Sequence, residues 1–464
     1  MNQISADKNG PLPEGLLVAW YGDDFTGAAA VMEVLTFAGL PSLLFLEPPT
    51  PAQLKSFPDL RGIGVASVAR SKSPEWMDGT LPSVFNQLRE LNPQILHYKV
   101  CSTLDSSPDT GSIGRAIEIG ANCMSTDMIP VLVAAPQMRR YQCFGHLFAS
   151  SGDEISRLDR HPVMSRHPVT PMTESDVARH IAKQSNRLNT QLLSLEALSA
   201  GDEILSLDRP AVGSLTAVSI DSIDASSEAA AGHAIWRARK QCPFVVGSQG
   251  IEFALVEHWL QIGQLSRREP AEGVGQSERM VSVSGSVSPT TADQIAWSTA
   301  NGFEGIEFDA VQVCGDEASL ENEIGRVVEK SLQAFSNGQD PLIYTASGPE
   351  DPSVARFLEA VETSDIEMST ANQTIGEALG RALRLVLEQS GTKRAVVSGG
   401  DTSGYATRQL DIFALSALAP TIPGASIFRA HAEGTMDGLE LALKGGQMGT
   451  PDYFGWVRDG GGTR

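Results

Sequence analysis

Short apolar runs alternate with longer polar segments of helical period along the whole chain. The apolar runs, which predict buried strands, fall at residues 16–20, 63–68, 130–135, 244–247, 280–283, 341–344 and 395–397. Segments such as 75–91, 228–241 and 374–388 have the length and apolar spacing of helices. Strands that alternate with helices in this way predict the α/β class, with largely parallel sheets.

The apolar period is lost between residues 263 and 280, where the sequence becomes charged and glycine-containing. Exposed connections between domains have this composition. A chain of 464 residues is also long enough for two domains. We therefore predict an N-terminal domain over residues 1–262, a linker over 263–280 and a C-terminal domain over 281–464.

The charge balance argues against a nucleic-acid partner. The chain has 35 Lys and Arg against 56 Asp and Glu, a formal charge of −21, which repels polyphosphate backbones over most of a surface. A small anion stays possible, because a cleft can provide local cations and helix N-termini.

Cysteine usage and the N-terminal sequence predict a cytoplasmic protein. The five cysteines are widely spread and form no C-x-x-C pair, which fits neither a disulfide framework nor a zinc site. The first 15 residues contain no apolar core of signal-peptide length, and no run of about 18 apolar residues could span a membrane.

Two adjacent carboxylates follow the first predicted strand. Asp23 and Asp24 stand where the segment LLVAWYG ends and a helical stretch up to Gly39 begins, and ligands of open α/β sheets bind at such strand ends. Either acid could accept a proton from a substrate hydroxyl, although Asp24 could equally cap the helix. Asp23 is our first candidate base, with Asp24 and Asp105 in reserve.

A second group of polar residues suits a carboxylate or polyol ligand. A lysine and several hydroxyls follow another predicted strand, and arginine and histidine recur between residues 139 and 173. Arginine can hold an acid through two parallel hydrogen bonds. Ordinary turns, surface ion pairs and structural histidines explain the same residues without a ligand. The candidate acid-binding residues are Arg70, Lys99, Ser102, Thr103, Arg140, Gly145, His146, Arg166 and His167.

Three Gly- and Ser-rich segments follow predicted strands in the second half, at residues 284–288, 398–404 and 444–449. Glycine lets the backbone approach a phosphate closely, and successive N–H groups can then donate to its oxygens. None of the segments is a Walker A motif, but together they predict a phosphate cradle. The candidate nucleotide-binding residues are Ser284, Gly285, Ser286, Gly399, Gly400, Asp401, Thr402, Gly446 and Gly449. The sequence assigns no metal ligands.

Taken in order, these segments resemble the motifs of the four-carbon acid sugar kinase family over nearly the whole chain. In the first half the D-D-F-T-G-A, C-S-T-x-D-S and H-P-x-T-P-M boxes correspond to residues 23–28, 101–106 and 167–172. In the second half G-S-x-S, G-G-x-T-S-G and L-A-L-K-x-G correspond to residues 285–288, 399–404 and 441–446. The chain departs from the commoner pattern at Gly22, Cys143, Phe144, Asp401, Tyr405 and residues 445–448.

The resemblance implies two α/β domains with the active site in the cleft between them. The N-terminal half would bind the acid, the C-terminal half would bind ATP with Mg²⁺, and the domains would close around both. The γ-phosphoryl group would move to a terminal hydroxyl of a tetronate, a 3-oxo-tetronate or a branched isoapionate-type acid. The departures on the sugar side leave the acid open, and a homodimer is one option for the assembly.

Two other functions are compatible with an α/β chain. An NAD(P)-dependent oxidoreductase of hydroxy acids would carry G-x-G-x-x-G after the first strand, where this chain has GDDFTGA. A non-catalytic sugar-acid-binding protein would usually be exported, and the signal peptide that export needs is not recognisable here. The kinase is the function that we expect.

Overall fold

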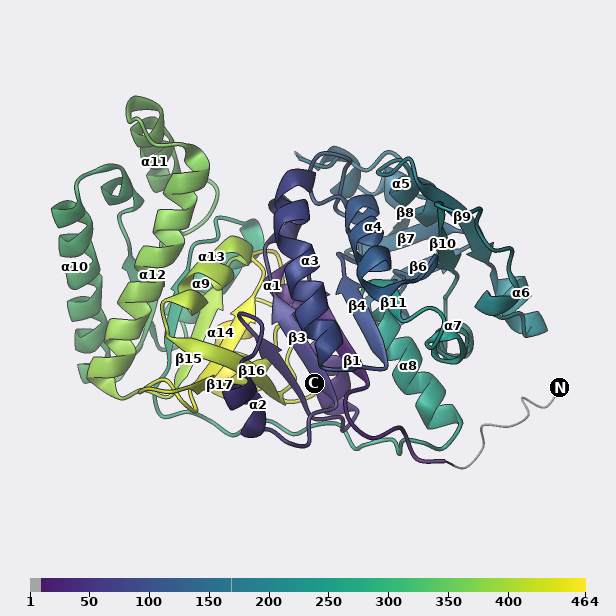
Figure 1. Cartoon of the computed structure of the whole chain (residues 1–464). Coiled ribbons are helices and arrows are strands. Elements are labelled where there is room, and N and C mark those ends of the chain that lie inside the picture. Colours follow the sequence, from purple (N-terminus) through teal and green to yellow (C-terminus); the bar gives the residue numbers. More distant parts are fainter. Residues whose placement is uncertain (1–9, 168) are drawn as a thin grey trace. The chain divides into compact units, whose positions relative to one another are not determined.

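The computed structural model describes residues 10–167 and 169–464, and these divide into two compact units (Figure 1). Unit 1 ends at Glu269 and unit 2 begins at Pro270. Both units alternate helices with mostly parallel strands, which confirms the predicted α/β class. Residues 263–280, all of them described, carry neither helix nor strand, and the division between the units falls within this stretch.

Unit 1 is built on a parallel sheet with the strand order β2-β3-β1-β4-β11-β5-β10-β9. Its central strands are buried along their whole length, as parallel strands covered on both faces are. The strands are β1 (Val18–Gly22), β2 (Ser42–Phe45), β3 (Gly62–Ala66), β4 (Ile95–Lys99), β5 (Met128–Leu132), β9 (Leu188–Leu193), β10 (Leu215–Ile220) and β11 (Phe244–Gly247). The helices are α1 (Phe25–Phe37), α2 (Pro51–Lys55), α3 (Pro74–Glu90), α4 (Ile113–Met124), α5 (Val177–Ala182), α6 (Leu195–Ala200), α7 (Ala225–Ala238) and α8 (Gly250–Gln261).

A small antiparallel sheet interrupts the alternation of unit 1. It consists of β6 (Arg140–Cys143), β7 (His146–Ser151) and β8 (Glu154–Arg157) in that order. Residues 143–146 form the tight turn between β6 and β7, and Phe144 and Gly145 adopt positive φ there. The apolar pattern did not predict this sheet, because its strands are short and only partly buried.

Unit 2 has the strand order β13-β14-β12-β15-β18-β17-β16, parallel up to β18 and antiparallel at the two last pairs. Its strands are β12 (Val281–Ser284), β13 (Phe303–Glu307), β14 (Asp340–Tyr344), β15 (Arg394–Ser398), β16 (Ile412–Ala419), β17 (Ile427–Ala432) and β18 (Glu440–Lys444). Its helices are α9 (Pro289–Thr299), α10 (Glu317–Ser336), α11 (Pro352–Thr363), α12 (Met368–Ser390), α13 (Gly400–Arg408) and α14 (Tyr453–Arg458).

Several helices begin at a capping residue followed by proline. A side-chain oxygen at the cap satisfies a free backbone N–H, and proline fits the first helical position because it lacks an N–H of its own. The pairs are Ser73-Pro74 at α3, Ser288-Pro289 at α9 and Asp351-Pro352 at α11. The start of α9 matters for the site below, because its cap lies beside a Gly/Ser-rich loop.

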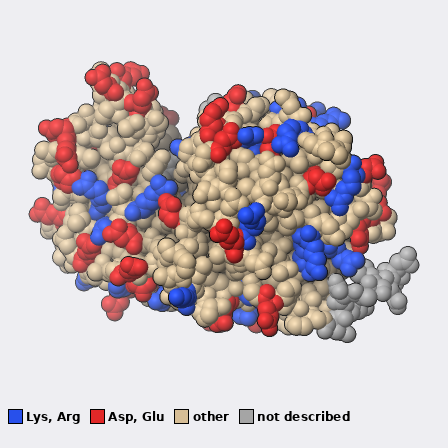
Figure 2. Space-filling view, in the orientation of Figure 1, with Lys and Arg blue, Asp and Glu red and all other residues tan. Residues whose placement is uncertain are grey.

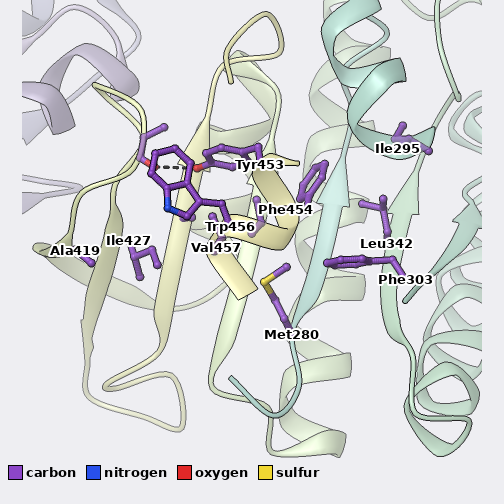
Figure 3. Packing of buried hydrophobic residues seen from close by; sticks show 13 residues of the cluster. Met280, Ile295, Phe303, Leu342, Ala419, Ile427, Tyr453, Phe454, Trp456 and Val457 are labelled. Atoms are coloured by element: carbon purple, nitrogen blue, oxygen red, sulfur yellow. Dashed lines mark hydrogen bonds between the residues drawn. The ribbon is translucent and has the colours of Figure 1, made fainter. Parts of the chain in front are cut away.

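The C-terminal helix α14 is anchored in the core of unit 2 (Figure 3). Tyr453, Phe454 and Val457 are buried among residues that include Phe303 and Leu342. The hydroxyl of Tyr453 donates to the carbonyl oxygen of Ala425 at 2.8 Å. This packing fixes the far end of the loop that joins β18 to α14.

On the face shown in Figure 2, acidic side chains gather over α10 and α11, and basic side chains are scattered among acidic ones. This distribution agrees with the excess of Asp and Glu in the sequence. Within the described residues, no helix has the length and apolar character needed to cross a membrane.

Candidate active site

Asp23 and Asp24 lie at the carboxyl end of β1, next to the end of β4. The backbone N–H of Asp23 donates to the carbonyl oxygen of Lys99 at 2.9 Å. The Asp24 carboxylate accepts from the N–H of Gly27 at 3.0 Å and so caps α1. This is the helix-capping role that the sequence suggested as the alternative to a catalytic one. The Asp23 side chain, only 4% exposed, makes no such cap.

Arg70 pairs with both aspartates. It lies in a short 3₁₀ turn, Ala69–Ser71, and its Nη2 is 2.9 Å from Asp23 Oδ1 and 2.6 Å from Asp24 Oδ1. Its Nε lies 3.4 Å from Asp23 Oδ2. The sequence suggested that the guanidinium of Arg70 binds the carboxylate of a substrate. In the structure it instead forms ion pairs with two carboxylates of the protein itself.

Lys99 brings a second positive charge to the same place. Its side chain is buried and its Nζ donates to the carbonyl oxygen of Val100 at 2.7 Å. A Cβ at Gly27 would lie 2.5 Å from this Nζ and 2.3 Å from Asp24 Oδ1. A side chain at position 27 would therefore displace the ends of both of these side chains, and glycine avoids this.

The two aspartates titrate as a pair with unequal pKa values. Burial, reinforced by the charge of Asp24, raises the pKa of Asp23 above its ordinary value. Burial also acts to raise the pKa of Asp24, but the charges of Arg70 and Lys99 outweigh it and leave that pKa lowered. A raised pKa suits a group that must accept a proton near neutral pH.

Asp105 and His167 meet through Thr170. The Thr170 hydroxyl donates to Asp105 Oδ1, and the Thr170 N–H donates to His167 Nδ1 at 3.1 Å. Because an amide N–H can only donate, Nδ1 is an acceptor, and the proton of the neutral imidazole is on Nε2. His167 therefore has an N–H available on its other nitrogen. Pro168, inside the same motif box, is outside the described residues.

Ser106 fixes the rest of the loop after β4. Its hydroxyl lies 2.9 Å from His180 Nε2 and donates to the carbonyl oxygen of Leu104. Burial lowers the pKa of His180 to about 4, so this histidine is neutral at physiological pH and structural. Leu104 has a positive φ of 53°, which the loop holds in place. Ser102 and Thr103 precede it and are partly exposed.

The other predicted acid-binding residues lie in or near the small antiparallel sheet. Arg140 Nη1 donates to the carbonyl oxygen of Met138 at 3.2 Å and to Ser150 Oγ at 3.1 Å. His146 Nδ1 lies 2.9 Å from Ser175 Oγ, while Arg166 is exposed. Burial lowers the pKa of Arg140, and the nearby Cys101 thiol only partly opposes this shift. Cys101 also acts to raise the pKa of Arg70, so it lies near both arginines.

Asp221 is a functional candidate that the sequence reasoning missed. Fully buried after β10, it accepts the backbone N–H groups of Phe144 at 2.7 Å, Gly145 at 2.9 Å and Leu195 at 3.3 Å. It therefore holds the turn that contains Gly145. An acid directly after an apolar strand is the same signal that drew attention to Asp23, and it could have identified Asp221.

In unit 2 the three Gly/Ser-rich segments converge at one edge of the sheet. Ser284 pairs in register with Ser398, and Ser398 pairs with Lys444, so the three strands end side by side. The N–H of Gly285 donates to the carbonyl oxygen of Ser398 at 3.1 Å, and the N–H of Gly399 donates to that of Lys444 at 2.9 Å. The three loops therefore lie side by side at the carboxyl ends of β12, β15 and β18.

Close contacts explain most of the glycines in these loops. A Cβ at Gly285 would lie 2.4 Å from Thr402 Oγ1, and one at Gly446 would lie 2.2 Å from Ser286 Oγ. Gly399 and Gly449 have φ of 129° and 93°. Around Gly400, by contrast, a Cβ would meet nothing within 4 Å. That open space lies at the N-terminus of α13; Asp401 is part of this helix, and its side chain is outside the described part of the chain.

The start of α9 holds the loop after β18. Ser288 Oγ donates to the carbonyl oxygen of Gly446 at 2.5 Å, and Thr291 Oγ1 donates to the same oxygen at 2.8 Å. Gln294 Nε2 donates to the carbonyl oxygens of Met448 and Thr450. The loop carbonyls are thus bound from the α9 side.

Two family models match the chain. One, described as a sugar-binding N-terminal domain, matches residues 18–255, and the other, a nucleotide-binding C-terminal domain, matches residues 281–454. The first model covers the aspartate pair, and the second covers the three converging loops.

Proteins of known activity are similar over nearly their whole length. The chain is 41% identical to the 3-oxo-isoapionate kinase of Paraburkholderia graminis, with 97% of this chain and 95% of that protein covered. It is 28% identical to a 3-oxo-tetronate kinase of Cupriavidus necator, with 96% and 97% covered. A Salmonella typhimurium LT2 structure provisionally described as a tRNA synthase has a TM-score of 0.75 at 22% identity, with 95% and 98% covered. That last likeness concerns the fold alone.

Proposed function

We propose that this chain, which belongs to the four-carbon acid sugar kinase family and is a sugar-acid kinase, phosphorylates a branched 3-oxo acid of the isoapionate type. The observation that carries the choice of acid is the identity of 41% to a 3-oxo-isoapionate kinase, against 28% to a 3-oxo-tetronate kinase. A 3-oxo-tetronate is the second candidate substrate. In either case the terminal hydroxyl oxygen attacks the γ-phosphorus of ATP, the bond to the β–γ bridging oxygen breaks, and ADP leaves.

In this mechanism Asp23 is the general base. It accepts the proton of the attacking hydroxyl, for which its raised pKa and buried carboxylate are suited. Asp24 is mainly the cap of α1 and a counter-charge for Arg70. The positioning of ATP and the neutralisation of its charge contribute more to phosphoryl transfer than a base does.

Asp105 acts through Thr170 and His167 rather than as a base. Its carboxylate orients the Thr170 hydroxyl, and Thr170 in turn holds His167 so that Nε2–H can donate to the 3-oxo or carboxylate oxygen of the acid. Thr170 is buried, whereas His167 is only partly buried, as a ligand-facing residue beside a rigid support would be.

The substrate carboxylate is bound by cations of unit 1. Lys99 and Arg70 neutralise the aspartate pair, and Arg70 also has further N–H groups for an acid. The remaining proposed acid-binding residues are Ser102, Thr103, Arg140, Gly145, His146 and Arg166. The turn held by Asp221 supports Gly145 within this set.

The three converging loops of unit 2 bind the phosphates of ATP. The N-termini of α9 and α13 add partial positive charge at the edge where these loops meet. The residues that we assign to the nucleotide are Ser284, Gly285, Ser286, Gly399, Gly400, Asp401, Thr402, Gly446 and Gly449.

Magnesium enters with the nucleotide. Mg²⁺ keeps several waters and is commonly bound through substrate phosphates and one or two carboxylates, so it needs no protein cage. The described residues include no group of three or more His, Cys, Asp and Glu that could hold a metal. Bound Mg²⁺ would neutralise charge on the β- and γ-phosphates, beside the hydroxyls of Ser286 and Thr402.

We place the enzyme in the cytoplasm. The five cysteines are free thiols, as is usual in a reducing compartment. A homodimer remains our expectation for the assembly, which size-exclusion chromatography with light scattering would test.

The decisive experiment measures ADP release from ATP and Mg²⁺ with branched 3-oxo acids, 3-oxo-tetronates and tetronates. We expect the highest kcat/KM with the branched 3-oxo acid, by at least tenfold. A higher kcat/KM for a straight-chain 3-oxo-tetronate would overturn the proposed substrate. Mass spectrometry of the product would identify the phosphorylated hydroxyl.

A further inference from the structure

Lys444 is a fully buried lysine at the edge of the sheet where the three nucleotide loops meet. It is the last residue of β18, and its backbone carbonyl accepts the N–H of Gly399. Gly445 and Gly446 follow it directly. Lysine is rarely buried completely unless its charge is paired, so the complete burial of Lys444 requires an explanation.

Among the described residues, the surroundings of the Lys444 ammonium contain an acceptor but no counter-charge. Nζ donates to the carbonyl oxygen of Gly445 at 3.0 Å and lies 5.9 Å from the ring centre of Tyr453. Within the described part of the chain no carboxylate pairs with it. Burial alone lowers the pKa of Lys444 to about 8. At neutral pH the group is therefore mostly charged, and a buried charge without a partner is costly.

The loop that follows Lys444 contains backbone N–H groups without an acceptor among the described residues. Its carbonyl groups at Gly446 and Met448 already accept from side chains of α9. The N–H groups of Gly446, Gln447 and Gly449 have no acceptor among the described residues. A loop whose carbonyls are bound and whose N–H groups are unused is suited to an anion.

We propose that Lys444 is the cation that binds the β- and γ-phosphates of ATP, with the backbone N–H groups of Gly446, Gln447 and Gly449 beside it. Lys444 would thus have the phosphate-binding role of the P-loop lysine in other nucleotide-binding proteins. It differs in its position, at the end of a strand instead of the start of a helix. The inference rests on the proposed nucleotide role of unit 2. The phosphate would supply the counter-charge that no described side chain gives Lys444.

The test replaces Lys444 by Met, which keeps the length and apolar stem, and by Gln, which keeps a donor for the Gly445 carbonyl. Binding of ATP, ADP and adenosine is measured by calorimetry without any acid substrate. We expect ATP affinity to fall about ten- to a hundredfold in both variants, with adenosine affinity unchanged. Lys393→Met, at an exposed lysine before β15, is the matched control and should bind ATP as the unmodified protein does.

Circular dichroism and thermal melting accompany the binding measurements. If a folded Gln or Met variant binds ATP as tightly as the unmodified protein, the proposal is wrong and Lys444 only ties β18 to its loop. An equal loss of ATP and adenosine affinity would also overturn it, because that outcome means collapse of the whole site. Since no acid is present, failure of this proposal is distinguishable from failure of the proposed substrate.

Discussion

Arg70 Nη2 lies 2.9 Å from Asp23 Oδ1, although the two residues are 47 positions apart in sequence. The contact joins the end of β1 to the 3₁₀ turn after β3 and gives the proposed base a fixed partner. Burial raises the pKa of Asp23, and Arg70 limits the rise. The same contact orients the Asp23 carboxylate that we propose as the base.

Replacing Asp23 by Asn should abolish most of the chemistry and spare nucleotide binding. The amide keeps the shape of the side chain but cannot accept the hydroxyl proton, so we expect kcat to fall about 10²- to 10⁴-fold. Steady-state kinetics and ATP calorimetry measure the two effects. Asp24→Asn is the matched control: asparagine also caps helices, and its kcat should fall much less. Equal losses in the two variants would contradict the assignment of Asp23.

The sequence predicted the α/β class because buried parallel strands are continuous apolar runs. The run at residues 244–247 corresponds directly to β11. The antiparallel strands β6, β7 and β8 gave no such signal, since most of their residues are only partly buried or exposed and no two successive residues are buried. The local pattern thus identified β11 and missed the partly buried strands of the small sheet, but β2 and β10, which are buried along their whole length, were also not among the predicted runs.

The sequence predicted which residues belong to the candidate site, but it did not predict how their side chains contact one another. Adjacent acids at a strand end suggested Asp23 and Asp24, but the pairing with Arg70 depends on a turn far away in sequence. Similarly, the lysine at the end of an apolar strand received no role, because only the three-dimensional structure shows that no described carboxylate pairs with Lys444.

Replacing Thr170 by Val should weaken acid binding without affecting ATP. Valine has nearly the same shape but cannot donate to Asp105, so the loop that carries His167 loses an anchor. We expect KM for the acid to rise about tenfold with a smaller change in kcat, which kinetics at saturating ATP would measure. Thr170→Ser keeps the hydroxyl and should restore the KM. A valine variant with unaltered KM would refute the positioning role of Asp105 and Thr170.

Replacing Gly400 by Asp should selectively weaken nucleotide binding. A side chain at this position has open space around it, so the variant should fold, and its charge would then repel the phosphates. Gly400→Ala is the matched control, with the same added Cβ and no charge. We expect ATP affinity to fall at least tenfold with Asp and less than threefold with Ala, by calorimetry. Similar affinities for the two variants would place the phosphates elsewhere.

The buried Glu228 makes the free energy of unfolding of unit 1 depend on pH. It is buried on α7, and Gln137 Nε2 donates to its Oε2 at 2.6 Å. Its Oε1 has no partner among the described residues. Burial, with a contribution from the charges of Glu257 and Asp224, raises its pKa from 4.5 to about 7. The folded state therefore holds a proton that the unfolded state releases between these pH values.

Stability should accordingly fall as the pH rises from 4.5 to 7, because the unfolded state then binds fewer protons than the folded state. Glu228→Gln resembles the protonated acid and removes this cost. We expect its Tm to exceed that of the unmodified protein by several degrees at pH 8.5, equivalent to about 2 to 3 kcal/mol. The gain should shrink towards zero as the pH approaches 5.

Calorimetric melting at pH 5, 6, 7 and 8.5 measures this difference, with Glu90→Gln as control. Glu90 ends α3 and is exposed, so its replacement removes one negative charge without removing a buried carboxylate, and its Tm difference should stay small at every pH. A gain for Glu228→Gln that is the same at pH 5 and pH 8.5 would mean that side-chain packing, and not ionisation, sets the stability at this position.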